Sequence, residues 1–137
     1  MKSVNIKGKE YITVNERLIY FRKQAMFKGW RIVEDLIDLN DKEGVFKVSI
    51  VDKDDNIIAS AHAQEYRDSS YINKTSFLEN GFTSALGRAL GYLGIGIDTS
   101  IASAEELVNA LNNQKPKTNQ YNNLKQNNLK QLQNVKF

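Results

Sequence analysis

The chain has 137 residues, which is enough for one domain with a modest hydrophobic core but too few for two. It contains no cysteine and one histidine, His62, so disulfides, a thiolate nucleophile and cysteine-ligated zinc are excluded, and most triad chemistry with them. The first residues are polar, and no segment is apolar for long enough to cross a bilayer. We therefore expect a soluble intracellular protein without a signal peptide or a membrane contact.

The net charge of +3 is unevenly distributed along the chain. All 16 acidic residues precede position 112, so residues 1–111 carry a net charge of −2 and residues 112–137 carry +5. Within the first part, residues 1–31 alone carry +6. This distribution, with basic ends and an acidic middle, is consistent with a polyanionic partner that binds to one surface of the protein. A solvated amphipathic helix with a basic tail would give the same pattern.

The start of the chain predicts an extended segment followed by an amphipathic helix. The extended segment runs over Val4–Val14 and is broken at Gly8. Asn15 is a suitable N-cap for a helix over Glu16–Phe27, and Gly29 is placed to end that helix.

Three strands are expected next, over Trp30–Leu39, Val45–Val51 and Ile57–Glu65. The acidic turn at residues 52–56 resembles the start of a calcium-binding loop, but apolar residues stand at the glycine and glutamate positions that such a loop requires. We therefore predict a hairpin turn there and no metal site.

A long helix is predicted over Thr75–Ile97, because its apolar residues fall on one arc at the helical period. That arc consists of Leu78, Phe82, Ala85, Leu86, Ala89, Leu90 and Leu93. On the third strand, one side is unusually small, since it carries Ile57, Ala59, Ala61 and Ala63. We hypothesise that the long helix packs against this alanine face.

Small residues form a second strip on the long helix, at Ser84, Gly87, Gly91 and Gly94, where another backbone could approach closely. Each glycine inside a helix costs about 1 kcal/mol against alanine, so packing or function must offset that cost. Arg88 lies at the border of the apolar arc, where a core helix with one solvent-reaching arginine would show the same pattern.

The end of the chain predicts a short helix and a tail. Ser103 followed by acidic residues resembles an N-cap, and we expect a helix from there to about Leu111. From Asn112 the composition becomes rich in Asn, Gln and Lys, and the string NNLKQ occurs twice. The predicted domains are therefore a folded part over residues 1–111 and a basic, disordered tail over residues 112–137.

These elements predict an α+β fold: an N-terminal helix, a three-stranded antiparallel β-meander packed by a long helix, and a short C-terminal helix. No catalytic constellation and no cofactor motif are present, so we expect a binding protein rather than an enzyme. Single-stranded nucleic acid requires a basic track for the phosphates and aromatic faces for the bases. The candidate binding residues are Arg17, Arg22, Lys23, Lys74 and Arg88 for phosphates, and Tyr71 and Tyr92 for stacking.

The most telling motifs are Glu16-Arg17-Leu18-Ile19, Lys28-Gly29-Trp30 and the string TSALGRAL at residues 83–90. With the order helix, meander and long helix, they resemble the single-strand annealing superfamily, which includes the eukaryotic annealing recombinase and phage proteins of the Erf and Sak types. The resemblance covers roughly Asn5–Asp98. The string that follows residue 69 is also similar to small phage proteins described as binding single-stranded DNA.

This resemblance implies a protein that binds single-stranded DNA during phage replication and recombination and promotes annealing of complementary strands. It also implies a ring or similar homo-oligomer in the cytoplasm of a bacterial host. Arg17 and Arg88 would line the DNA groove, with Lys74 near a third basic site. The chain departs from the family pattern at Gly87 and Gly91, where further basic residues would be expected, and this puts the groove's affinity in question.

Two other functions remain open from the sequence. One is a single-strand-binding protein that protects DNA without annealing it, on a barrel-type fold. The other is a protein-interaction module of a replication complex, which insensitivity to oligonucleotides would favour. An enzyme of an unrecognised type is a remote third.

Overall fold

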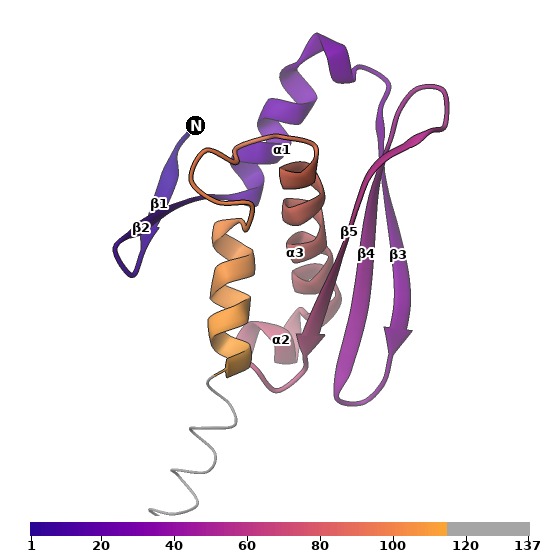
Figure 1. Ribbon diagram of the computed structural model, residues 1–137. Coiled ribbons are helices and arrows are strands. Elements are labelled where there is room, and N and C mark those ends of the chain that lie inside the picture. Colours follow the sequence, from indigo (N-terminus) through magenta and orange to yellow (C-terminus); the bar gives the residue numbers. More distant parts are fainter. Residues whose placement is uncertain (115–137) are drawn as a thin grey trace, which may run out of the picture.

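A computed structural model describes residues 1–114 of the chain (Figure 1). The elements in chain order are β1 (Ser3–Ile6), β2 (Lys9–Ile12), α1 (Val14–Lys23), the short 3₁₀ helix η1 (Ala25–Phe27), β3 (Arg31–Leu39), β4 (Glu43–Val51), β5 (Ile57–Tyr66), α2 (Tyr71–Thr75), α3 (Phe77–Tyr92) and a last helix over residues 104–114. The predicted α+β fold is confirmed. Among the described residues, no helix is both long enough and apolar enough to span a membrane.

The main sheet is the predicted meander, with β4 in the centre and antiparallel pairing on both sides. The extended segment expected at the start of the chain is instead a separate two-stranded hairpin of β1 and β2. Its turn uses left-handed backbone at Lys7 (φ 52°) and Gly8 (φ 84°), so the glycine expected to break the segment reverses the chain.

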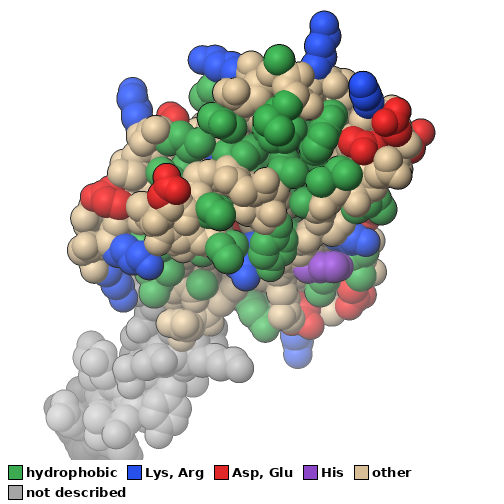
Figure 2. Space-filling view, turned by 45° about the horizontal axis from the view of Figure 1, so that its top comes forward, with side chains coloured by type: hydrophobic (Ala, Val, Ile, Leu, Met, Phe, Trp, Pro, Cys, Tyr) green, Lys and Arg blue, Asp and Glu red, His purple; other side chains and the backbone are tan. Residues whose placement is uncertain are grey.

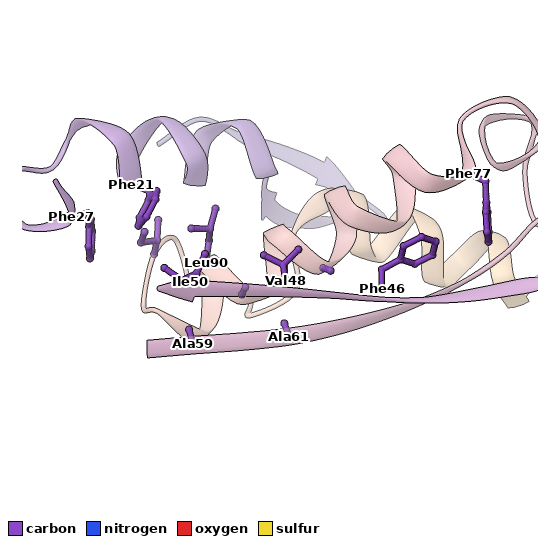
Figure 3. Close-up of a cluster of buried hydrophobic side chains, with 12 residues drawn as sticks. Phe21, Phe27, Phe46, Val48, Ile50, Ala59, Ala61, Phe77 and Leu90 are labelled. Atoms are coloured by element: carbon purple, nitrogen blue, oxygen red, sulfur yellow. The ribbon is translucent and has the colours of Figure 1, made fainter. Parts of the chain in front are cut away.

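The core lies between one face of the sheet and the helices. Phe46, Val48 and Ile50 alternate along β4, and all three are fully buried. Figure 3 shows these side chains pointing from β4 toward the helices, with Phe21 and Leu90 above them. Because successive residues of a strand face opposite sides, this alternation assigns one whole face of the sheet to the core.

The predicted packing of the long helix on the alanine face is confirmed. Ala59 and Ala61 of β5 belong to the same buried cluster as Ala85 and Ala89 of α3. The small side chains let α3 lie close to the sheet, on β4 and β5.

Ile57, which was expected on this face, is 64% exposed. The reason is an irregularity in the pairing of β4 with β5. Ile50 pairs with Ala59 but Val51 pairs with Ile57, so Ile58 is an extra residue in β5. A one-residue bulge interrupts the alternation of faces, which turns Ile57 away from the core.

Helix α1 begins earlier than predicted, because Thr13 and not Asn15 is its N-cap. The Thr13 hydroxyl accepts a hydrogen bond from the backbone N–H of Glu16 at 3.3 Å. A second cap comes from far along the chain, since the N–H of Val14 donates to the carboxylate of Glu105 at 2.9 Å. A tertiary cap of this kind is not visible in the local sequence.

The predicted long helix is shorter than expected, since α3 begins at Phe77 and not at Thr75, and a separate short helix, α2, precedes it. Ser70 caps α2, and Ser76 interrupts the helical backbone between the two helices. Helix α3 ends at Tyr92 because Gly94 adopts φ 102° just after it. There the N–H groups of Gly94 and Ile95 donate to the carbonyls of Gly91 and Leu90, which is the Schellman arrangement.

In the small strip of α3, Ser84 faces β5 through its hydrogen bond to Glu65, whereas Gly87 and Gly91 face away from the alanine strand. A methyl group at Gly87 would lie 2.7 Å from Val14 and 2.7 Å from the hydroxyl of Ser103, and one at Gly91 would lie 2.9 Å from the carbonyl oxygen of Ile101. The strip therefore lets α1 and the segment before the last helix approach α3 closely.

The last helix starts at the predicted cap. The N–H of Ser103 donates to the Glu106 carboxylate at 2.8 Å, and the N–H of Glu106 donates to the Ser103 hydroxyl at 3.2 Å, so the two residues form a capping box. The helix continues to residue 114, beyond the expected boundary at residue 111. The rest of the predicted tail, residues 115–137, lies outside the described residues.

Candidate nucleic-acid interface

The seven candidate binding residues do not form a single groove. They lie on three helices, with Arg17, Arg22 and Lys23 on α1, Tyr71 and Lys74 on α2, and Arg88 and Tyr92 on α3. In Figure 1 the C-terminal end of α1 and helix α2 lie at opposite ends of α3. The three groups are therefore considered separately.

Arg17 is fully buried, and this corrects its expected position at the lip of a groove. Its Nη1 donates to the carbonyls of Gly87 at 2.7 Å and Ile101 at 2.8 Å, and its Nη2 donates to those of Ser100 at 3.0 Å and Gly96 at 3.1 Å. A guanidinium enclosed in this way holds the loop that follows α3 and cannot reach a phosphate on the surface.

The surroundings of Arg17 explain the two glycines that depart from the annealing pattern. A methyl group at Gly91 would lie 2.8 Å from Arg17 Nη1, so a larger residue there would displace the guanidinium. Burial lowers the pKa of Arg17, although the nearby carboxylates of Glu106 and Glu105 act in the opposite direction. Arginine remains charged under such conditions, so the core of this region contains a permanent cation.

Arg88 and Tyr92 are neighbours, as their spacing of one helical turn requires. The Arg88 Nε donates to the Tyr92 hydroxyl at 2.8 Å, and its Nη1 forms an ion pair with Glu106 at 3.2 Å. The hydrogen bond to Tyr92 is the main cause of the raised pKa of Arg88. Because Glu106 balances its charge, Arg88 is a weaker phosphate site than the sequence alone predicted.

Helix α2 presents Tyr71 and Lys74 to the solvent, and Tyr71 is 81% exposed. Between them, Asn73 points inward and is buried. This pair has the exposure that base stacking and phosphate contact require, but it stands apart from the other candidates.

The C-terminal end of α1 gathers cations that remain free. We call Arg22, Lys23 and Lys28 the basic end of α1; all three are exposed, and none forms an ion pair with any residue in 1–114. Arg22 donates to the carbonyl of Trp30 at 3.1 Å, which ties the helix end to the start of the sheet. Lys28 was not among the candidate site residues, because only the turn at η1 brings it beside the end of the helix.

Two further features adjoin the basic end of α1. Lys53 of the β4–β5 turn approaches it, since a methyl group at Gly29 would lie 3.7 Å from the Lys53 Cβ. Tyr20 and Met26 are exposed apolar side chains on α1 and η1, at 40% and 71%. Figure 2 shows hydrophobic side chains gathered over one face, with Lys and Arg side chains around its edge. A surface of this composition suits a partner with phosphates and apolar base edges.

A hollow of about 610 Å³ lies next to Tyr20, between the β1–β2 hairpin and the loop after α3. Its lining includes the carboxylates of Glu10 and Asp98. Hydrogen bonds from Ser3 and Asn5 lower the pKa of Glu10, so this carboxylate stays charged. Two carboxylates repel phosphates, and the hollow is therefore not part of the proposed interface.

A buried polar network joins β5, α2, α3 and the last helix. Glu65 accepts hydrogen bonds from Asn73 at 3.2 Å and Ser84 at 3.4 Å, and Asn80 connects Asn73 to Asn109. Burial raises the pKa of Glu65. Its partners are amides and a hydroxyl that hold four elements together, and within residues 1–114 no cluster of three potential metal ligands accompanies them.

Comparison with known protein families gives a match to the region that contains the sheet and α3. Residues 20–93 match the family described as Slr1353 N-terminal dsRNA-binding domain-like, and these residues run from the end of α1 through the sheet to the end of α3. The match covers more than half of the chain. No curated protein and no solved structure matches the chain significantly.

The match overturns the resemblance to the single-strand annealing superfamily, which is wrong. The family found here covers the end of the first helix, the meander and the long helix, which make up most of the region on which that resemblance rested. An order of elements is shared by unrelated families, so it could not discriminate between them. Arg17, which the resemblance placed in a DNA groove, is instead buried beside Gly87 and Gly91, the two positions that depart from the family pattern.

Proposed function

The chain belongs to the family described as Slr1353 N-terminal dsRNA-binding domain-like, and we propose on that premise that it binds nucleic acid, with double-stranded RNA as its preferred ligand. The family match over residues 20–93 is the observation that carries the proposal. Single-stranded DNA, the ligand predicted from the sequence, is the main alternative to double-stranded RNA. Strand annealing, phage recombination and a ring-shaped oligomer were suggested only by the resemblance to the annealing superfamily and are no longer supported.

The chemistry of the basic end of α1 supports this proposal. Double-stranded RNA is recognised mostly by its shape and by contacts to phosphates and 2′-hydroxyls, because its major groove is too narrow for side chains to read. Arg22, Lys23 and Lys28 offer exposed cations for such contacts. Contacts of this kind carry little sequence information, so we propose a binding protein with low sequence selectivity and without catalytic activity.

The test is fluorescence anisotropy of the full chain with four labelled ligands of one sequence. These are an RNA duplex of about 20 base pairs, longer than the roughly 16 base pairs that a double-stranded RNA-binding domain spans, the corresponding DNA duplex, and the two single strands. We expect the RNA duplex to bind most tightly. Its affinity should fall steeply between about 50 and 200 mM salt, since phosphate contacts release counterions.

Two results would overturn the proposal in different ways. Tighter binding of single-stranded DNA would restore the ligand predicted from the sequence, and the exposed Tyr71 would then be the first stacking candidate to test. Absence of binding to all four ligands at the lowest salt concentration would favour a protein-interaction module instead.

A further inference from the structure

One side of α3 is left open beside β3. A groove of about 420 Å³ runs there between the helix and the edge strand. It is lined by Glu34, Leu78, Glu79, Phe82, Thr83 and Leu86. The groove is separate from the basic end of α1 and from the buried polar network.

The groove is open because α3 packs mainly on β4 and β5, so that the inner face of β3 is covered at Ile32 but not at Leu36. Leu36 pairs with the buried Phe46 and therefore faces the same side of the sheet, yet it is 45% exposed. Leu78, on the facing side of α3, is 44% exposed. Single exposed leucines are ordinary, but Leu78, Phe82 and Leu86 line one groove together, and apolar side chains gathered in this way indicate a binding surface.

The charge of this surface limits what can bind there. Glu34 and Glu79 line the groove. Neither forms an ion pair with any residue in 1–114. A second copy of the chain, paired edge to edge through β3, would bring these carboxylates against their own equivalents. A basic, apolar segment is a better complement.

We propose that this groove binds the C-terminal segment of the same chain, residues 121–137. Residues 121–137 contain three lysines and no acidic residue, so the charge of this segment is opposite to that of the groove. The segment also contains five apolar side chains, Leu124, Leu129, Leu132, Val135 and Phe137, which suit the apolar lining of the groove.

The end of the described chain lies within reach of the groove. Asn80 of α3 donates to Asn109 of the last helix at 3.1 Å, so the last helix runs beside the N-terminal half of α3. In Figure 1 it ends near α2. Residues 115–120 can span up to about 20 Å when extended, which exceeds the roughly 10–12 Å diameter of a helix. The segment can therefore pass around the start of α3.

A spin label tests this placement directly. The chain has no cysteine, so Gln131→Cys provides one attachment site, between Leu129 and Leu132. In isotope-labelled full chain, we expect the amide signals of Leu36, Leu78 and Thr83 to lose intensity when the label is in its paramagnetic form. Amide signals on the edge of β5, such as that of His62, should keep their intensity.

Charge reversal provides the matched comparison. Glu34→Lys together with Glu79→Lys should abolish the loss of signal, whereas Asp54→Lys together with Asp98→Lys changes the net charge equally and should leave it intact. A second variant replaces both leucines by Leu129→Asn and Leu132→Asn and carries the spin label at Asn134→Cys. The loss of signal at the groove should be abolished in this variant as well. The unchanged remainder of each spectrum shows that the domain is folded.

Three outcomes would overturn the proposal. The groove amides could keep their intensity, or the loss could occur at another surface. The loss could also appear only in a mixture of spin-labelled and isotope-labelled molecules, which would show a second copy and not the chain's own segment in the groove. None of these outcomes depends on whether the protein binds nucleic acid.

Discussion

Arg17 and the basic end of α1 show two uses of positive charge on one helix. Arg17 is enclosed by backbone carbonyls from the loop after α3, whereas Arg22 and Lys23, little more than one turn later, are exposed. The residue types are the same, and the glycines of α3 make the difference, because they leave the space that the Arg17 guanidinium fills.

The comparison teaches that the position of a cation in a sequence does not indicate whether it binds a ligand or holds the fold. A buried arginine must be surrounded by acceptors, and its loss then leaves those acceptors unsatisfied. Exposed cations contribute little to stability and remain available for phosphates. Substitution of Arg17 should therefore lower the stability of the fold, whereas substitution of Arg22, Lys23 and Lys28 should weaken binding to nucleic acid.

The largest effect is expected for Arg17→Met, which removes the guanidinium and leaves several buried carbonyls without a donor. We expect the free energy of unfolding to fall by about 3–5 kcal/mol, because each buried carbonyl left without a donor costs about 1–3 kcal/mol. Urea unfolding followed by circular dichroism measures this change. Arg22→Met is the matched control and should change the free energy by less than about 0.5 kcal/mol. Equal effects for the two variants would contradict the comparison.

A smaller effect is expected for Gly91→Ala. The added methyl group would lie 2.8 Å from Arg17 Nη1 and 2.9 Å from the carbonyl oxygen of Ile101, so the joint around Arg17 must shift. Overpacking of this kind costs about 1–3 kcal/mol, which outweighs the gain of about 1 kcal/mol in helix propensity.

The double variant Gly91→Ala with Arg17→Met tests whether Gly91 is required because it leaves space for the Arg17 side chain. The cost of Gly91→Ala should be smaller when Arg17 is absent, because the main clash has been removed. Additive costs in urea unfolding would show that Gly91 is required for another reason.

Glu65 is a buried carboxyl group, and its pH dependence can be compared with the permanent charge of the buried Arg17. Because burial raises its pKa in the folded state, the folded chain binds this proton more tightly than the unfolded chain. Its contribution to stability is therefore fully present below the unfolded pKa of about 4.3 and is lost as the pH rises through the raised, folded pKa.

Glu65→Gln cannot ionise, so its free energy of unfolding should fall less than that of the wild type over this range of pH. Urea midpoints measured from about pH 4 to neutral check the difference, with the exposed Glu79→Gln as control. A wild-type dependence that survives in Glu65→Gln would assign it to another group.

The smallest effect on stability, and the largest on binding, is expected when Arg22, Lys23 and Lys28 are all replaced by glutamine. The free energy of unfolding should change by less than about 0.5 kcal/mol for each replacement. Affinity for the RNA duplex should fall, because fewer phosphates are neutralised. The slope of log affinity against log salt should decrease by about 1 for each phosphate that the variant protein no longer binds.

Replacement of Lys2, Lys7 and Lys9 by glutamine is the control for that variant. It removes the same charge from the β1–β2 hairpin, which lies outside the residues that match the family. An equal loss of affinity in the two variants would mean that net charge, and not the basic end of α1, determines binding.

The order of elements could be predicted from local patterns. Alternation of apolar residues indicated the three strands, the alanines of β5 indicated where α3 packs, and Ser103 with Glu106 indicated the start of the last helix. These features depend on neighbours in the sequence, which is why local reasoning was sufficient. The bulge at Ile58 depends on the pairing of two strands and could not be read from one of them.

The candidate site was less predictable, because the fate of each charge depends on residues far along the chain. The α+β class, the helical period of α3 and the surplus of positive charge at both ends follow from the amino-acid sequence alone. The burial of Arg17, the ion pair of Arg88 with Glu106 and the exposed position of Lys28 beside Arg22 and Lys23 follow only from the folded arrangement. The physical reason is that periodicity sets which face of a helix is apolar, whereas the exposure of a charge is set by what packs against that face.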